Sequence, residues 1–333
     1  MATPTTAHPV ASTPNVPSDV SPLMKVLAVG GALLGGPAVA YYFLKPKSPY
    51  KRDFEKEKVY VYQYPRTPVI PSLSARCLTL ETYLRMMKIK YENCVKNPWL
   101  RSSKEDCPPF VELNGQEISD SKTILKKLAE KLKIDEQSAT ADLKVKEVEI
   151  EKCLQDLIWC SHHFRYKGKN CRDLFSEQIG GKLAASIPIV PHCRRIMVQM
   201  MFDGDPAYRF GCRNSIAAKV ENHMKEKIGQ YFKTMNLLAT DANVLSLAKK
   251  HLLSLSDVLG SKKWFLAETV TSIDAKVFGV IGQIIYVPLG NPLEKMIFVE
   301  CSNLVAFCEN IRLTFWPDWA EILQTGKMDT KML

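Results

Sequence analysis

The chain has 333 residues, of which 46% are hydrophobic and 24% charged, and this balance is typical of a folded protein with one or two domains. Its formal net charge is +10, but the basic residues are scattered among acidic ones without an arginine-rich tract, which argues against nucleic-acid binding. The ten cysteines form no CxxC pair with metal-finger spacing, so reduced thiols are favoured over a disulfide scaffold or a structural metal.

Two contrasting segments occupy the start of the chain. Residues 1–21 are rich in Pro, Thr, Ser and Ala; they cannot bury enough apolar surface to offset their ordering entropy and are expected to be disordered. Residues 22–44 are apolar with one charge, Lys25, and are long enough to cross a hydrocarbon core of about 30 Å. We predict a single-pass membrane anchor here, with a cleaved signal peptide or a buried or interfacial helix as alternatives. Basic residues follow at once, so the positive-inside rule predicts that the C-terminal domain faces the cytosol, at a membrane that the sequence does not identify.

A charged linker over residues 45–58 leads to an α/β pattern over residues 59–135. Its strands are apolar runs bounded by turn residues, and Asn114-Gly115 is the type I′ signal that joins two antiparallel strands. Ser72 or Ser74 can cap the first helix. The predicted order is a strand at 59–65, a helix after Ser74, a strand at 91–95, strands on either side of the turn, and a helix with apolar positions from Ile124 to Leu132.

Residues 141–325 have helical periodicity throughout. The pair Thr271 and Asp274 forms a capping box immediately before an apolar helix. The predicted fold class is therefore an α+β thioredoxin-like N-terminal domain followed by an all-α C-terminal domain, with a transmembrane helix in front of both. A small α/β domain followed by helices is the plan of a glutathione transferase.

Two stretches of sequence resemble a known family. The first is VYVYQYPRTPVIPSLSARCLTLETYLRMMKIKY together with PFVELNGQEISDSKTIL, and the second is LSDVLGSKKWFLAETVTSIDAKVFG. Both resemble the failed axon connections family, which includes cadmium-responsive transferase-like proteins and is related to the metaxins. The resemblance covers roughly residues 58–325. It implies the glutathione-transferase fold, but kinship at the level of fold leaves the chemistry open.

The resemblance implies a glutathione thiol site at the start of the first helix. Ser74 would be the hydroxyl that stabilises the thiolate, helped by the helix dipole, and Cys77 would lie one turn inside. The alternative is that Ser74 simply caps the helix and Cys77 packs in the core.

The resemblance also implies a site for the γ-glutamyl end of glutathione at Asp120 and Ser121. Ser121 and a backbone N–H at a helix N-terminus can bind a carboxylate, while Asp120 can accept from an ammonium group. An Asp-Ser pair before a helix is equally an ordinary cap.

The proline pair departs from the family pattern, in which the residue before a cis-proline binds the ligand through its N–H and C=O. If Pro109 is the cis residue, Pro108 has no N–H to donate, which costs about 0.5–1.5 kcal/mol of binding free energy, or up to about 3 if the ligand group stays unsatisfied. If Pro108 is the cis residue, Cys107 supplies both groups. The sequence leaves the two open.

Cys160 and His163 stand at i, i+3 on a predicted helix with Cys153 and His162 nearby, but the apolar neighbours indicate core, and we expect no metal site. Two functional hypotheses remain. In the first, the chain is an interaction or scaffold module at a membrane, with protein partners or as a homodimer, in axon development or metaxin-like roles. In the second, it is an active glutathione transferase or a glutathione-dependent enzyme of cadmium or xenobiotic stress, with glutathione as substrate or ligand.

Overall fold

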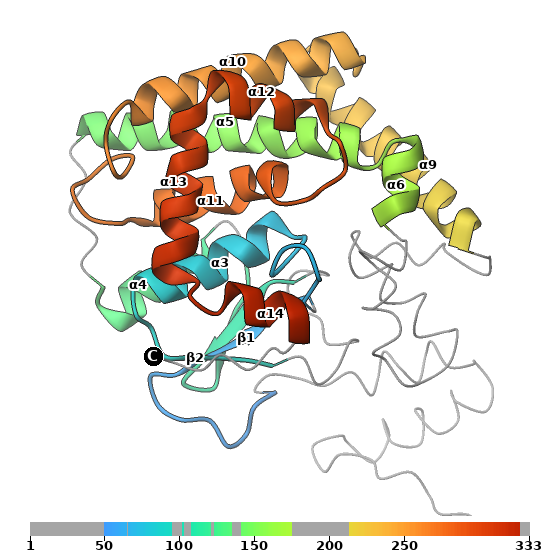
Figure 1. Ribbon diagram of the computed structural model, residues 1–333. Helices are drawn as coiled ribbons and strands as arrows, with labels where there is room; N and C mark the ends of the chain where they lie inside the picture. Colours follow the sequence, from blue (N-terminus) through green and yellow to red (C-terminus); the bar gives the residue numbers. More distant parts are fainter. Residues whose placement is uncertain are drawn as a thin grey trace, which may run out of the picture. The chain divides into compact units, whose positions relative to one another are not determined.

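The computed structural model describes seven stretches of the chain. They are residues 50–64, 66–94, 102, 108–120, 123–134, 141–174 and 213–326. Residues Lys51–Leu333 form one compact unit, and the helices and strands described below all belong to it (Figure 1).

The α/β part contains a four-stranded mixed sheet. The strands lie in the order β2-β1-β3-β4, with β1 parallel to β2 and antiparallel to β3, and β3 antiparallel to β4. Its elements are β1 (Val59–Tyr62), α3 (Ala75–Met86), β2 (Tyr91–Asn93), β3 (Phe110–Leu113), β4 (Gln116–Ile118) and α4 (Ile124–Leu132). The predicted thioredoxin-like order of strands and helices is observed, although β1 and β2 are shorter than the sequence suggested.

The turn between β3 and β4 has the predicted form. Asn114 and Gly115 both have positive φ, 52° and 74°, as a type I′ turn requires. A side chain at Gly115 would also meet the ring of Phe54, since a Cβ there would lie 2.8 Å from Phe54 Cε1. The turn therefore fixes the register in which Val111 pairs with Ile118.

The remaining described helices form the all-α part. They are α5 (Ala141–Arg165), α6 (Gly168–Leu174), α9 (Arg213–Thr234), α10 (Asp241–Leu259), α11 (Ser272–Ile285), α12 (Pro292–Glu300), α13 (Ser302–Phe315) and α14 (Trp319–Thr325). The predicted capping box is present at the start of α11, where the Asp274 carboxylate accepts from the Thr271 N–H at 2.8 Å. The same carboxylate accepts from the Phe265 N–H at 2.9 Å, which fixes the preceding loop.

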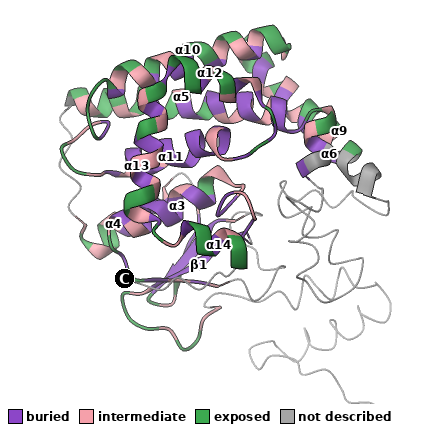
Figure 2. Cartoon of the chain, in the orientation of Figure 1, coloured by how far each residue is buried: buried purple, intermediate pink, exposed green. Residues whose placement is uncertain are grey.

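Helix α11 joins the two parts. It packs against both α3 and α5, and Figure 1 shows it between them. Buried residues occupy almost its whole length, and they also dominate α3 and the strands, whereas α10 carries exposed residues on its outer side (Figure 2). A helix that is apolar on all sides must be covered on all sides. The α/β part and the helical part thus share one hydrophobic core.

The predicted membrane-spanning helix is not supported. The long described helices α5, α9 and α10 carry charged residues along their whole length, and no helix in the described part of the chain is both long and apolar enough to span a membrane. This finding contradicts the transmembrane part of the predicted fold class. The proposed span, residues 22–44, and the tail at residues 1–21 both lie outside the described residues. The orientation toward the cytosol depended on that helix and stays a prediction.

Candidate functional site

Ser74 lies at the N-terminus of α3, where the resemblance places the thiol-binding hydroxyl. Its backbone is extended, with φ −90° and ψ 118°, and its Oγ accepts from the N–H of Cys77 at 3.4 Å. The Ser74 N–H in turn donates to Ser72 Oγ at 3.2 Å. This is the geometry of a helix cap, the alternative role that the sequence left open for Ser74.

Cys77, one turn inside α3, belongs to the core. Its side chain is fully buried, and burial raises the pKa of its thiol to about 11 against the opposing effect of the Ser74 contact. A nucleophilic or ligand-activating cysteine needs a lowered pKa and access to solvent. Cys77 has neither.

Two side chains of the helical part hold the loop that precedes Ser74. Arg165 Nη1 donates to the carbonyl of Leu73 at 3.2 Å, and Gln283 Nε2 donates to the carbonyl of Ser72 at 3.0 Å. Arg165 Nη2 also donates to the main-chain and side-chain oxygens of Gln283. These acceptors of the buried Arg165 guanidinium are all neutral oxygens. Burial, which removes water from the charged group, lowers the pKa of Arg165. The start of α3 is therefore fixed by the domain opposite to its own.

The proline pair precedes β3, and the peptide bond between Pro108 and Pro109 is cis. Pro109 is therefore the cis residue. The resemblance, aligned on PFVELNG, places Pro108 at the position from which the family binds its ligand through the main chain. Pro108 can offer a carbonyl but no N–H. Cys107, the other candidate for this position, lies outside the described residues.

Asp120 ends the loop before α4 in an unusual backbone conformation, with φ 111°. Its main-chain carbonyl accepts from the N–H groups of Thr123 and Ile124, both at 2.9 Å. Its Oδ2 accepts from Thr123 Oγ1 at 2.7 Å and lies 3.9 Å from Lys127 Nζ. Asp120 thus organises the first turn of α4, while its predicted partner Ser121 lies outside the described residues.

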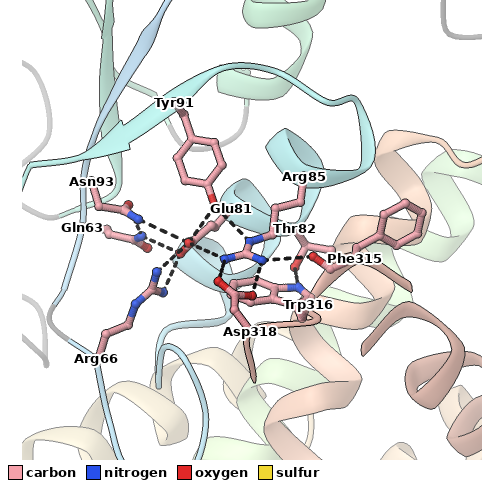
Figure 3. Close-up of polar contacts among 10 residues, drawn as sticks. All are labelled: Gln63, Arg66, Glu81, Thr82, Arg85, Tyr91, Asn93, Phe315, Trp316 and Asp318. Atoms are coloured by element: carbon pink, nitrogen blue, oxygen red, sulfur yellow. Dashed lines mark hydrogen bonds and ion pairs between the residues drawn. The ribbon is translucent and has the colours of Figure 1, made fainter. Parts of the chain in front are cut away.

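A buried polar cluster lies deeper along α3, and sequence reasoning missed it (Figure 3). Glu81 is fully buried and forms two hydrogen bonds of 2.6 Å with the guanidinium of Arg66. Gln63, Tyr91 and Asn93 also donate to its carboxylate, at 2.7, 3.0 and 3.3 Å. Burial alone would raise the pKa of Glu81, but the neighbouring guanidinium groups and donors lower it to about 2. The sequence signal that could have indicated this cluster is Glu81 itself, a charged residue among the apolar positions of α3.

A second guanidinium extends this cluster to the C-terminal helices. Arg85 binds the carboxylate of Asp318 through two hydrogen bonds, of 2.6 and 2.9 Å, and donates to the carbonyl of Phe315 at 3.1 Å. It stacks on Trp316, 3.9 Å from the ring centre, and the indole N–H donates to Thr82 Oγ1 at 3.1 Å. In Figure 3 these groups lie side by side between α3 and the segment after α13. The cluster connects the two domains and has the buried character of a structural network, although Gln63 Oε1 and Arg66 Nε have no hydrogen-bond partner in it.

Family comparisons agree with this architecture. The sequence model of the Glutathione S-transferase N-terminal domain family matches residues 75–171, and that of the Glutathione S-transferase C-terminal domain family matches residues 248–311. Failed axon connections of Drosophila melanogaster is 29% identical over 277 residues, which cover 82% of this chain and 62% of that protein. This chain is a homologue of Failed axon connections.

The likeness to the metaxins is more local. A Metaxin-1 homolog of Caenorhabditis briggsae is 34% identical over 92 residues, covering 28% of this chain and 30% of that protein. Metaxin-3 of Danio rerio is 33% identical over 84 residues, covering 25% and 27%. Each of the three matches covers less than two thirds of the relative's own length. The chain thus spans only part of each of these relatives.

Solved structures include glutathione transferases of low sequence identity. One from Phanerochaete chrysosporium is 9% identical with a TM-score of 0.48, and covers 77% of this chain and 97% of that one. One from Methylobacterium radiotolerans, in complex with glutathione sulfonate, is 12% identical with a TM-score of 0.42, and covers 79% and 94%.

The cysteines and histidines of α5 do not converge as the metal hypothesis required. No group of three or more His, Cys, Asp or Glu side chains in the described stretches is arranged to hold a metal ion. Cys160 is fully buried, and burial raises the pKa of its thiol to about 12. His163 instead lies 2.8 Å from Asp241 at the surface of this homologue of Failed axon connections.

Proposed function

We propose that this homologue of Failed axon connections is a glutathione-transferase-like interaction module that does not turn over glutathione. The observation that carries the proposal is Pro108, which stands where a ligand would need a main-chain N–H. A ligand group left without that donor loses about 0.5–1.5 kcal/mol of binding free energy, or up to about 3 if it stays unsatisfied. The geometry around Ser74 supports the same conclusion, because its hydroxyl oxygen caps α3 and Cys77 is buried.

The proposed partner is a protein, either a second copy of this chain or another folded domain. Two features support this role. The relatives that this chain resembles are named for axon connections and as metaxins. The α/β and helical parts share one core, with a buried polar cluster across it. A module with rigidly joined domains presents a constant surface to a partner. We infer a role in axon development or of the metaxin kind.

A second candidate function is glutathione binding and transfer, and one observation favours it. Asp120 has φ 111°, a conformation that is rare for a residue with a side chain and that clusters at ligand sites in other proteins. It lies shortly before α4, where the resemblance places the γ-glutamyl group, and Ser74 lies at the N-terminus of α3.

Calorimetric titration of the full-length protein with glutathione separates the two functions. In the titration, we expect Pro108→Ala to bind glutathione about three- to tenfold more tightly than wild type, because the substitution restores the main-chain N–H donor. In a separate activity assay, we expect no turnover of chlorodinitrobenzene by the wild-type protein. Ser121→Ala, which removes the hydroxyl that the resemblance assigns to the γ-glutamyl end, is the matched control. Tight wild-type binding that Ser121→Ala abolishes, together with turnover, would establish the transferase instead.

Self-association is tested separately by sedimentation of the same full-length protein over a range of concentrations. A concentration-dependent dimer identifies the second copy as the partner. A monomer at all concentrations directs the search to a different folded domain.

A further inference from the structure

A chain of four polar side chains crosses the helical part between α5, α9 and α10. The imidazole Nδ1 of His251 lies 3.2 Å from Cys153 Sγ. On the other side of the ring, Nε2 lies 2.8 Å from Asp156 Oδ2, within ion-pair distance but not aligned as a hydrogen bond. The second oxygen of that carboxylate accepts from the hydroxyl of Tyr231 at 2.6 Å. The order is a thiol, an imidazole, a carboxylate and a phenol.

This cluster lies away from Ser74, where the resemblance places the glutathione thiol. Cys153 lies on α5 twelve residues before Arg165, the residue that holds the loop next to Ser74, and this spacing corresponds to about 18 Å along the helix. From the sequence alone, Cys153 is only a candidate metal ligand together with its neighbours on the same helix. Its partner His251 comes from a different helix, α10.

The charge of Asp156 bears on which nitrogen of the imidazole carries the proton. A carboxylate beside Nε2 favours the tautomer that carries its proton there, which leaves Nδ1 as the acceptor that faces the thiol. Burial is the main effect on His251 and lowers its pKa, with Asp156 opposing. His251 is therefore neutral at neutral pH, which is the state that a base requires.

Burial and the neighbouring charges keep the Cys153 thiol protonated before it reacts. Burial is the largest effect and raises the pKa of Cys153; Asp156 and Glu149 act in the same direction, while Lys152 and the hydroxyl of Ser254 oppose it. Around the ring, Lys250 of α10 and Lys152 of α5 disfavour the imidazolium. A thiol in this setting gains nucleophilicity when a neighbouring base takes its proton.

Access to solvent distinguishes Cys153 from most of the other thiols in the stretches that the structure describes. It is half-buried, whereas Cys77, Cys160, Cys171, Cys301 and Cys308 are buried. Cys94 is half-buried as well; its thiol lies 3.8 Å from the carbonyl of Glu92 and interacts electrostatically with Lys51. Cys94 therefore serves as a comparison of similar exposure, and because a neighbouring lysine favours a thiolate, it is a demanding one.

We propose that Cys153 is a nucleophilic thiol that exchanges with small-molecule disulfides, with His251 as its general base and Asp156 and Tyr231 as positioning residues. His251 Nδ1 takes the thiol proton while the sulfur attacks one sulfur of the disulfide. A new S–S bond forms to Cys153, the old S–S bond breaks, and the departing thiolate receives the proton from His251. The products are a mixed disulfide on Cys153 and one small-molecule thiol, so that no other oxidant is needed.

The test uses the reduced full-length protein and the disulfide dithiodipyridine, with peptide mass spectrometry to assign each modified cysteine. Near neutral pH we expect Cys153 to react at least about tenfold faster than Cys94, and His251→Gln to slow Cys153 by about 10- to 100-fold. The difference should narrow at alkaline pH, where the thiolate forms without a base. Tyr231→Phe, which keeps the ring that stacks on Trp159, should slow the reaction by a smaller factor.

The matched control is His163→Gln, which breaks another His–Asp contact of 2.8 Å on the same helix, with Asp241. It should leave the rate at Cys153 unchanged. Equal rates for wild type and His251→Gln at neutral pH would overturn the proposal. If His251→Gln does not fold, the wild-type profile decides: a rate at Cys153 that follows a single ionisation with the pKa of an isolated thiol would overturn it as well.

Discussion

Glu81 is a single residue on which several segments of the α/β domain depend. Its carboxylate accepts from Gln63 at the end of β1, from Tyr91 and Asn93 of β2, and from Arg66 in the loop that leads to α3. A fully buried carboxylate is stable only while its partners remain charged and in place. Removing the charge leaves the buried guanidinium of Arg66 without its counterion.

We predict that Glu81→Gln lowers the free energy of unfolding by about 3–5 kcal/mol, measured by urea denaturation. The folded-state pKa of Glu81, about 2, lies below its ordinary value of 4.5, so its contribution is fully present above pH 4.5 and is lost as the pH falls toward 2. The variant should lack that part of the acid dependence. Glu130→Gln, in an exposed pair with Lys126 at 4.0 Å, should change stability by less than about 0.5 kcal/mol. A comparable loss in both variants would contradict this account.

At the scale of elements, the crossing of α3 and α11 is close because of a glycine. A Cβ at Gly279 would lie 2.0 Å from Thr79 Oγ1 and 2.8 Å from the main-chain oxygen of Ala75. The second contact is with backbone and cannot be relieved by a rotamer change. The helices would have to move apart, and the shared core would lose packing.

Gly279→Ala should therefore destabilise the protein by about 1–3 kcal/mol in thermal or urea unfolding, although alanine favours helices. Gly229, in the interior of α9, provides the matched control because a Cβ there would meet nothing within 4 Å. Gly229→Ala should stabilise by about 0.4–1 kcal/mol. Two substitutions with the same chemistry are thus expected to act with opposite sign, and stabilisation by Gly279→Ala would refute the close crossing.

The elements themselves were predictable where the signal is local. The Asn114-Gly115 turn, the capping box of Thr271 and Asp274, and the periodicity of α4 all depend on residues within a few positions of one another. Contacts that connect distant segments were not predictable, because one sequence carries no record of which helices meet. Arg85 and Asp318 are 233 positions apart.

The candidate site was predictable only in part, for a similar reason. Ser74 and Asp120 are found at the helix starts that the sequence indicated, and the structure assigns the cis bond to Pro109, which the sequence left open. The pairing of Cys153 with His251 spans 98 positions and gave no signal. The membrane-spanning prediction rested on residues 22–44, which lie outside the described residues, and the described helices that are long enough to cross a membrane carry charged residues.

For the whole molecule, the question is whether the two domains unfold separately. Domains joined by small polar interfaces move and unfold independently, but a large apolar interface prevents this. Here α11 packs against α3 through buried residues, and Arg165, Gln283 and Arg85 fix main-chain groups of the opposite domain. The unit Lys51–Leu333 should therefore unfold as one cooperative structure.

Two buried thiols, one in each domain, provide the measurement. Cys77 lies in α3 and Cys308 in α13, and both side chains are fully buried, so each reacts with a pulse of alkylating reagent only after its own domain opens. Mass spectrometry after labelling at increasing urea should give the same midpoint for both. Arg85→Lys should lower both midpoints together, because lysine cannot reproduce the paired hydrogen bonds to Asp318. If Cys77 became reactive at lower urea than Cys308, the α/β domain would be an independent unit, and the contacts across α3 and α11 would be too weak to couple it to the helices.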